Sequence, residues 1–342
     1  MNILVYDVAA ETGGATSILK YFYEQHKQDR ENHYFYMLST FHLEETDNIT
    51  VINVPEVKKG WKNRLLFDYF GVKKYLKQFQ IDEVLSLQNI GVPCFKGKQT
   101  VYVHNALPFA EYRYSLRESK LMWVYQNVIG KMMLSSIRKA DCVIVQTQWM
   151  KDAIARKIPK AANKTEVRFP EVDIPQGLQY TRQKKCVFFY PANSAPFKNH
   201  HLILQACRLL KVEGVENYTV EFTLKGDETP AISQLKEAAL AEGLPIDWLG
   251  VLPREQVFEK YQHSVLVFPS YIETVGLPIF EAKSVGAPLL LADCAYAKNV
   301  AGDYADAHFY PYHDAQMLAS HMKRQIGLST EEIQVSGRDH YE

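Results

Sequence analysis

Short apolar runs alternate with longer segments of helical periodicity along the whole chain. In the first half, the apolar runs predict strands at residues 3–6, 34–38, 50–53, 83–87, 100–104 and 142–145. The segments between them predict helices at residues 15–28, 62–78, 116–137 and 147–157. Apolar strands separated by amphipathic helices predict a parallel sheet with helices on both sides.

The same alternation starts again after an irregular stretch. Residues 163–185 contain two prolines, a glycine and many polar side chains, which is typical of a connection between domains. Beyond them, strands are predicted at 187–190, 220–224, 247–249, 265–269, 288–292 and 307–310, with helices at 199–210, 231–241, 254–262, 278–285, 295–300 and 314–326. We therefore expect an α/β protein with a Rossmann-like domain over residues 1–165, a linker over 166–185 and a second Rossmann-like domain over 186–342. Ligands of such sheets bind at the carboxyl ends of the strands.

Composition narrows the class of protein. The chain is 47% hydrophobic and 23% charged, which excludes a disordered or coiled-coil chain. Basic and acidic residues balance at 39 each, so no overall charge attracts nucleic acid. The five cysteines are never spaced as Cys-x-x-Cys, which favours the reducing cytoplasm over a disulfide framework. No apolar run approaches the roughly 20 residues of a membrane helix, and the apolar start predicts a strand rather than a secretion signal.

The first candidate site is the pair Gly13 and Gly14, which follows the first predicted strand and opens the first helix. Paired glycines allow backbone N–H groups to approach an anion, and the helix dipole adds to the attraction. The run matches neither the dinucleotide fingerprint nor the P-loop. A turn that only joins strand to helix explains the glycines equally well.

The second candidate site follows the strand predicted over 265–269. Glu273 falls in the loop and Glu281 in the helix that Pro278 begins, with the N–H groups of Gly276 and Leu277 between them. Two such carboxylates can accept hydrogen bonds from sugar and ribose hydroxyls, and the N–H groups can hold phosphate. The alternative is that both glutamates are simply solvated.

Lys198 belongs to the third candidate site, residues 193–199, between the first strand of the second half and its helix. A lysine at such a junction is suited to bind phosphate. Most lysines in this setting are nevertheless solvated, so Lys198 alone does not define a site.

The order and spacing of these motifs resemble those of glycosyltransferase family 4, a group of retaining nucleotide-sugar transferases. Residues 273–281, E-T-V-G-L-P-I-F-E, resemble its E-x7-E signature. Similar runs over nearly the whole chain are Gly13-Gly14, V-H-N around His104, K-N at Lys198, K-G-D at Gly226 and L-G-V before Leu252. The resemblance implies the GT-B fold, in which two doubly wound Rossmann-like domains face a central cleft.

The resemblance also implies roles for individual residues. Lys198 would bind the donor phosphates, Glu273 would contact hydroxyls of the transferred sugar, and Glu281 would hold the nucleotide ribose. His104 would reach the transferred sugar near its C6 hydroxyl, although it could instead cap the end of a strand. The other implied donor-binding residues are Gly13 and Gly14 at the diphosphate, Gly226 and Val251 at the base, and Asn193, Thr274, Val275, Gly276 and Leu277.

The sequence departs from the family pattern at several of these positions. Asn193 stands where a second phosphate-binding arginine is common, which puts the stabilisation of the leaving group in doubt. Thr274 and Val275 replace a glycine and a phenylalanine, which can alter the shape of the donor-sugar site. The chain ends at Glu342, before the helix that in the family crosses back onto the first domain, which raises the alternative of a truncated chain.

The resemblance implies a metal-independent, retaining transfer of a hexose from a nucleotide sugar, UDP in preference to GDP. The acceptor would be a glycan or a lipid-linked glycan in surface-polysaccharide or glycolipid assembly. The lack of any Asp-x-Asp pair in the sequence agrees with a site without metal, and no cofactor beyond the donor is expected. A sugar-nucleotide epimerase of the same fold and a catalytically silent sugar-binding or partner subunit remain alternatives. A dehydrogenase is disfavoured because no glycine fingerprint follows either first strand.

Residues 112–139 combine basic side chains with an apolar stripe. Such a segment can associate with an anionic membrane surface, and a long helix packed on its own sheet would show the same pattern. The first 180 residues carry 24 basic against 19 acidic side chains, which would suit the lipid-linked acceptors common in the resembled family. The expected location is therefore the cytoplasm, with the inner face of the membrane as a further possibility.

Overall fold

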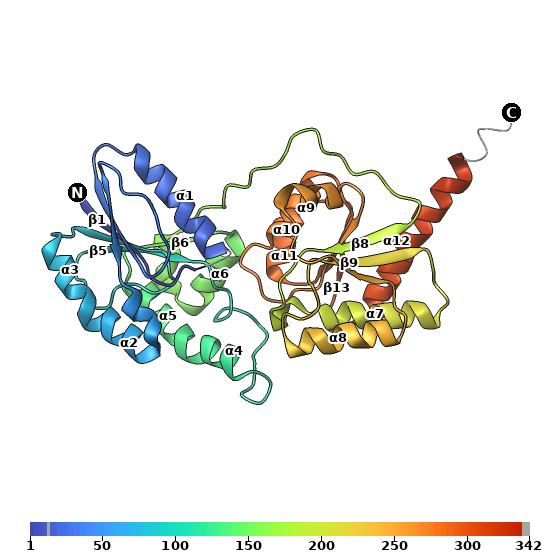
Figure 1. Ribbon diagram of the computed structural model, residues 1–342, viewed down its shortest axis with the longest axis horizontal. Coiled ribbons are helices and arrows are strands. Elements are labelled where there is room, and N and C mark those ends of the chain that lie inside the picture. Colours follow the sequence, from blue (N-terminus) through green and yellow to red (C-terminus); the bar gives the residue numbers. More distant parts are fainter. Residues whose placement is uncertain (12–13, 337–342) are drawn as a thin grey trace. The chain divides into compact units, whose positions relative to one another are not determined.

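The computed structural model describes residues 1–11 and 14–336, with side chains as far as residue 329. The chain divides into two compact units, Met1–Glu171 and Val172–Glu342 (Figure 1). Each unit contains one parallel sheet with surrounding helices, as the alternation of apolar and amphipathic segments predicts. All five cysteines are free thiols.

The first unit has a seven-stranded sheet, in the order β3-β2-β1-β4-β5-β6-β7, within the described residues. The chain winds one way from β1 to β3 and the other way from β4 to β7, so ligands of this fold are expected where β1 and β4 end. Its elements are β1 (Asn2–Asp7), α1 (Gly14–Gln28), β2 (His33–Leu38), β3 (Ile49–Asn53), η1 (Pro55–Lys59), α2 (Trp61–Leu66), η2 (Phe67–Gly71), α3 (Val72–Gln78), β4 (Glu83–Ser86), β5 (Lys98–Val103), α4 (Lys120–Val124), η3 (Tyr125–Ile129), α5 (Gly130–Lys139), β6 (Cys142–Val145), α6 (Gln148–Lys157), η4 (Pro159–Lys164) and β7 (Thr165–Val167).

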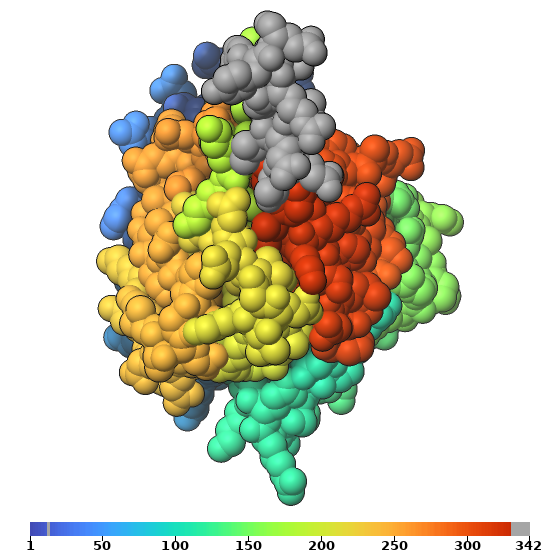
Figure 2. Space-filling view, turned by 90° about the vertical axis from the view of Figure 1, so that its right-hand side faces the viewer, coloured from blue at the N-terminus to red at the C-terminus, as the bar shows by residue number. Residues whose placement is uncertain are grey.

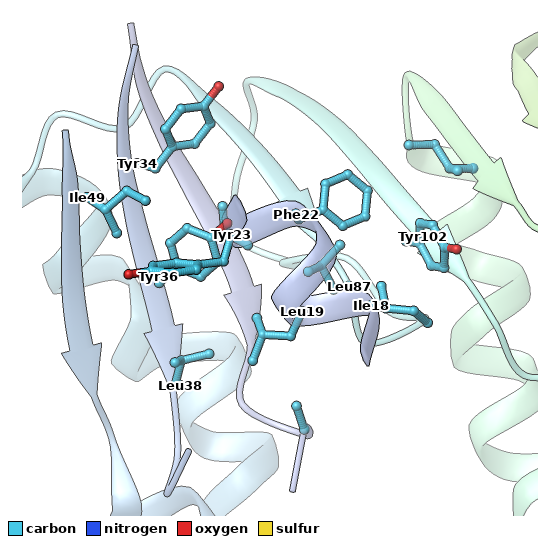
Figure 3. Close-up of a cluster of buried hydrophobic side chains, with 13 residues drawn as sticks. Ile18, Leu19, Phe22, Tyr23, Tyr34, Tyr36, Leu38, Ile49, Leu87 and Tyr102 are labelled. Carbon is cyan, nitrogen blue, oxygen red and sulfur yellow. The ribbon is translucent and has the colours of Figure 1, made fainter. Parts of the chain in front are cut away.

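Helices cover both faces of this first sheet. On one face, Ile18, Leu19, Phe22 and Tyr23 of α1 pack against apolar side chains of β1, β2 and β3 (Figure 3). On the other face, Phe67 and the side chains around it form a second core cluster. Figure 1 shows α2, α3 and α5 on this second side. The buried apolar strands therefore lie between two helical layers, as expected for a parallel sheet.

The helix predicted over residues 62–78 is interrupted. A π-helical turn, η2, separates α2 from α3. In this wider helical turn, both Phe67 and Asp68 point inward. Phe67 joins the core. Asp68 accepts a hydrogen bond from the Tyr6 hydroxyl and pairs with Arg64 Nε at 2.9 Å. A regular apolar periodicity does not reveal such a one-residue insertion.

The segment over residues 112–139 is helical from Lys120 to Lys139, with the π-helical turn η3 in the middle. It begins later than predicted because Ser119 caps it, its hydroxyl accepting the N–H of Met122 at 3.3 Å. Ile129, Met133 and Ile137 are buried. Part of the apolar stripe therefore packs inside the first unit.

The segment expected to be a linker begins with a strand. β7 pairs in parallel with β6 at the edge of the first sheet, so Glu166 and Val167 belong to that sheet. The strand escaped prediction because it is short and only Thr165 of its residues is buried, which leaves no apolar alternation to detect.

The second unit has a six-stranded sheet, in the order β10-β9-β8-β11-β12-β13, within the described residues. Its elements are β8 (Cys186–Tyr190), η5 (Pro196–Lys198), α7 (His200–Val212), β9 (Tyr218–Phe222), α8 (Pro230–Ala241), β10 (Ile246–Trp248), α9 (Arg254–Tyr261), β11 (Val265–Phe268), α10 (Leu277–Ser284), β12 (Leu289–Ala292), α11 (Ala295–Ala301), β13 (Ala307–Tyr310) and α12 (Ala315–Ser336). The last helix is longer than the predicted 314–326 and packs on α7. Figure 2 shows α12 in red along the surface of this unit.

Candidate donor-binding site

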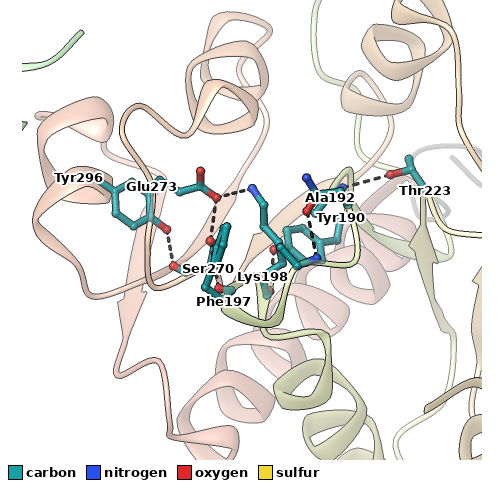
Figure 4. Close-up of polar contacts among 10 residues, drawn as sticks. Tyr190, Ala192, Phe197, Lys198, Thr223, Ser270, Glu273 and Tyr296 are labelled. Atoms are coloured by element: carbon teal, nitrogen blue, oxygen red, sulfur yellow. Dashed lines mark hydrogen bonds and ion pairs between the residues drawn. The ribbon is translucent and has the colours of Figure 1, made fainter. Parts of the chain in front are cut away.

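Lys198 and Glu273 lie together at the carboxyl ends of neighbouring strands. Lys198 follows β8 in the short turn η5, and Glu273 follows β11, which pairs with β8. Lys198 Nζ forms an ion pair with Glu273 Oε1, and only 13% and 15% of the two side chains are exposed (Figure 4). Two motifs that stand 75 residues apart in the sequence therefore meet in one site.

Neighbouring groups hold this ion pair in place. The buried Ser270 hydroxyl donates a hydrogen bond to Glu273 Oε1 at 2.7 Å, and the Tyr296 hydroxyl donates to the Ser270 carbonyl. The Tyr190 hydroxyl donates to the Lys198 carbonyl at 2.7 Å. Lys198 and Ser270 both bond to Oε1, and no hydrogen bond from another described residue reaches the second carboxylate oxygen of Glu273.

The loop that follows Glu273 turns into α10 at Gly276. Gly276 adopts φ 76°, and a Cβ there would lie 3.1 Å from the ring of Tyr296, so glycine is the residue that fits. No side chain caps α10, and its first turn, from Leu277, has no acidic residue. The positive end of the helix is therefore suited to an anion. Val275 is buried in the loop and Thr274 is half-buried.

Glu281 lies one turn inside α10 and its side chain is only 8% exposed. Arg254 Nη1 donates to one carboxylate oxygen at 2.9 Å, and the Tyr261 hydroxyl donates to the other at 3.1 Å. Arg254 Nη2 also donates to the carbonyl of Asp173 at 2.8 Å. Arg254 is not among the residues predicted from the sequence, because it stands 27 residues before Glu281 and no local motif links the two.

Gly226 and Val251 lie in loops that follow two neighbouring strands, β9 and β10. The loops are joined by a hydrogen bond of 3.0 Å from the Gly250 N–H to the Leu224 carbonyl. The Gly226 N–H is already used, since it donates to Glu228 at 3.1 Å. A base could therefore be held there by carbonyl oxygens or by the exposed Val251 side chain, but not by the Gly226 N–H as it stands.

Asn193, at the position where an arginine was expected, shapes its own loop. Its side-chain oxygen accepts the N–H of Ala195 at 3.1 Å, which is a local turn interaction. Within the described part of the second unit, the cations paired with the two signature glutamates are Lys198 and Arg254.

His104 and Gly14 belong to the first unit and follow β5 and β1 of the same sheet. The His104 N–H donates to Asn89 Oδ1 at 2.7 Å, and its Nε2 lies 3.0 Å from the Leu87 carbonyl. Burial lowers the pKa of His104 to about 4, so the ring is neutral at pH 7. These bonds connect the end of β5 to the loop after β4. They correspond to the alternative role of His104, which is to cap the end of a strand. Gly13 lies outside the described residues.

Comparison with known protein families finds a match within the second unit. Residues 179–331 match the family model described as glycosyl transferases group 1. A curated relative, the O-antigen chain mannosyltransferase B of Escherichia coli, is 32% identical over 138 residues, which make up 40% of this chain and 36% of the relative. The chain thus matches little more than a third of that relative's length.

Solved structures resemble the chain over nearly its whole length. The sucrose-phosphate synthase of Thermosynechococcus elongatus has a TM-score of 0.69 at 14% identity, covering 98% of this chain and 94% of its own. Anabaena HepE in complex with UDP-glucose has a TM-score of 0.64 at 16% identity, covering 98% and 91%. The fold is therefore that of GT-B glycosyltransferases. The match to the group 1 glycosyl transferase model covers most of the second unit.

Proposed function

We propose that this protein is a retaining, metal-independent glycosyltransferase that moves a hexose from a nucleoside-diphosphate sugar to a glycan or lipid-linked acceptor. The observation that carries the proposal is the Lys198–Glu273 pair beside the uncapped start of α10. It combines a cation and helix N–H groups suited to a diphosphate with a carboxylate suited to sugar hydroxyls. UDP is the favoured nucleotide, with support from the UDP-glucose bound to the similar HepE.

The transfer breaks the bond between the anomeric carbon and the β-phosphate oxygen, and negative charge collects on that phosphate. Lys198 and the N–H groups of Gly276 and Leu277 stabilise this charge more strongly in the transition state than in the bound donor. The new bond forms from the acceptor oxygen on the same face of the sugar, and the acceptor proton passes to the departing phosphate. Glu273 orients the sugar through its hydroxyls, and Glu281 holds the ribose.

No metal is required in this proposal. Among the described side chains, residues 1–11 and 14–329, no three histidine, cysteine or acidic groups come together in a way that could hold a metal ion. Positive charge at the leaving group would come from Lys198 instead. Turnover should therefore persist in excess EDTA, and restoration of lost turnover by Mg²⁺ or Mn²⁺ would contradict this part of the proposal.

The acceptor is proposed to be a bacterial-type surface glycan. The name of the Escherichia coli relative supports an O-antigen-like chain. No helix among the described residues has the length and apolarity to cross a bilayer. We propose a cytoplasmic enzyme that works at the inner face of the membrane, where a lipid-linked acceptor would be presented.

Product analysis tests the proposal. The full chain is incubated with UDP-glucose, UDP-galactose or GDP-mannose, each with and without mannose-terminated oligosaccharides carrying a hydrophobic aglycone. Transfer to the oligosaccharide with an α-linkage, seen by NMR, is the expected result. A β-linked product would contradict retention, and conversion of the donor to its epimer without acceptor would identify an epimerase.

A further inference from the structure

An unusual concentration of large apolar side chains is exposed on the helix that follows β3. Trp61, Leu65, Leu66, Tyr69 and Phe70, here called the α2 patch, are 58%, 38%, 50%, 46% and 64% exposed. Trp61, Leu65 and Tyr69 follow one another at intervals of four residues, as do Leu66 and Phe70, so the members of each set are neighbours on the surface of α2 and η2. Phe67 and Asp68, which alternate with them, are buried. The patch is therefore the outward face of an element whose inner face is already packed.

The surroundings of the α2 patch are strongly basic. Residues 55–78 contain six lysines and one arginine against two acidic residues, Glu56 and Asp68, and Lys58 pairs with Glu11 at 2.8 Å. Asp68 is buried and paired with Arg64, so it does not offset the lysines at the surface. Lys73 Nζ lies 5.2 Å from the centroid of the Phe70 ring, so positive charge and exposed aromatic surface lie side by side.

We propose that the α2 patch docks on the surface of an anionic phospholipid bilayer. An interfacial helix has aromatic and leucine side chains on one face and lysines at its flanks, and tryptophan and tyrosine are enriched at the level of the lipid headgroups. Each lysine close to an anionic surface strengthens binding about fivefold. The inference does not depend on sugar transfer, since the patch lies in the first unit and the donor site in the second.

A second surface competes for this role. In the segment over residues 112–139, Leu121 and Val128 are 57% and 49% exposed, and α4 and α5 lie on the same side of the first sheet as α2 (Figure 1). The aromatic Trp123 of that segment is only half-exposed. The α2 patch exposes three aromatic side chains, so it supplies the main contact.

Vesicle flotation with matched variants tests the proposal. The full chain is mixed with phosphatidylcholine vesicles, pure or with about 30% phosphatidylglycerol. We expect binding to the anionic vesicles, with strong weakening when NaCl rises from about 0.1 M to about 1 M, because the Debye length falls from about 10 Å to about 3 Å. The variant Trp61→Ser/Phe70→Ser should reduce binding about tenfold or more, and Leu121→Ser/Val128→Ser should leave it within about twofold.

Other results would overturn the proposal. The α2 patch would be excluded as the docking surface if the wild-type chain does not bind anionic vesicles. It would also be excluded if Leu121→Ser/Val128→Ser abolishes binding and Trp61→Ser/Phe70→Ser does not. A wild-type dimer in light scattering that becomes monomeric on Trp61→Ser/Phe70→Ser would identify a protein interface instead. Unchanged circular dichroism and nucleotide binding show that the variants fold, and a chain that binds vesicles but transfers no sugar would refute only the proposed function.

Discussion

Replacing Lys198 by methionine tests separately what the Lys198–Glu273 pair contributes to stability and what Lys198 contributes to turnover. Methionine keeps an unbranched apolar side chain close to the length of the lysine stem and removes the charge. Glu273 would keep the hydrogen bond from Ser270 but lose its cation while only 15% exposed. Leaving such a carboxylate incompletely paired costs about 1–3 kcal/mol. For a unit of this size each kcal/mol corresponds to about 2–4 °C, so the transition of the second unit should fall by about 2–12 °C.

The double variant Lys198→Met/Glu273→Gln makes the test specific. The neutral glutamine amide can still accept from Ser270 and no longer needs a cation, so most of the lost stability should return, with a coupling energy of about 1 kcal/mol or more. Turnover should not return, because loss of one transition-state donor lowers it about 10²–10³-fold and the sugar contact of Glu273 is lost as well.

Differential scanning calorimetry gives the transition temperatures, and release of nucleotide from the donor in the presence of acceptor gives turnover. If Lys198→Met transfers sugar at the wild-type rate, Lys198 does not stabilise the leaving group. If the losses of stability measured for Lys198→Met and for Glu273→Gln simply add in the double variant, the ion pair does not contribute to the stability of the second unit. Either result would refute the corresponding half of the reasoning.

Three further predictions follow from the second unit. Gly276→Ala should lower its stability by about 1–3 kcal/mol, because alanine is strained at φ 76° and its Cβ would lie 3.1 Å from Tyr296; an unchanged transition in calorimetry would show that the loop relaxes. Burial lowers the pKa of His200 to about 3, so the neutral ring contributes its full share of stability above the unfolded pKa of about 6.5. As the pH falls to about 5, the free energy of unfolding should decrease by about 2 kcal/mol, because the unfolded chain binds a proton there that the folded chain does not. Urea unfolding of wild type and His200→Phe checks this, since the variant should lack that part of the pH dependence. Arg254→Gln should weaken UDP binding by about threefold to tenfold, because the Glu281 carboxylate is then held less firmly in place, and Glu281→Ala should weaken binding more. Isothermal titration calorimetry measures both affinities. Wild-type affinity in both variants would exclude Glu281 as a nucleotide ligand.

The fold could be predicted from the sequence because buried parallel strands leave a strong signal. Short β-branched and aromatic runs between amphipathic segments identified twelve strands close to their places in the structure. The strand that escaped, β7, lies at a sheet edge with two exposed residues and so carries no apolar pattern. The π-helical turns at Phe67 and Tyr125 also escaped, because each adds one residue to an otherwise regular helix.

The candidate site could be predicted only in part. Lys198, Glu273 and Glu281 stand in motifs with recognisable spacing, and the structure gives the first two a shared contact. Ser270, Tyr296 and Arg254 carry no motif and become visible only when the end of β11 and the helices α9, α10 and α11 are folded together. Long-range pairings of this kind are set by topology, which local patterns do not contain.

A crystal structure of the full chain with an intact nucleotide sugar tests the central claim most directly. UDP-glucose and GDP-mannose are the two donors to soak. The proposed donor site requires the pyrophosphate within about 3 Å of Lys198 Nζ and of the N–H groups that begin α10, with Glu281 on the ribose hydroxyls. A bound donor whose phosphates lie away from Lys198, or whose ribose does not reach Glu281, would contradict it.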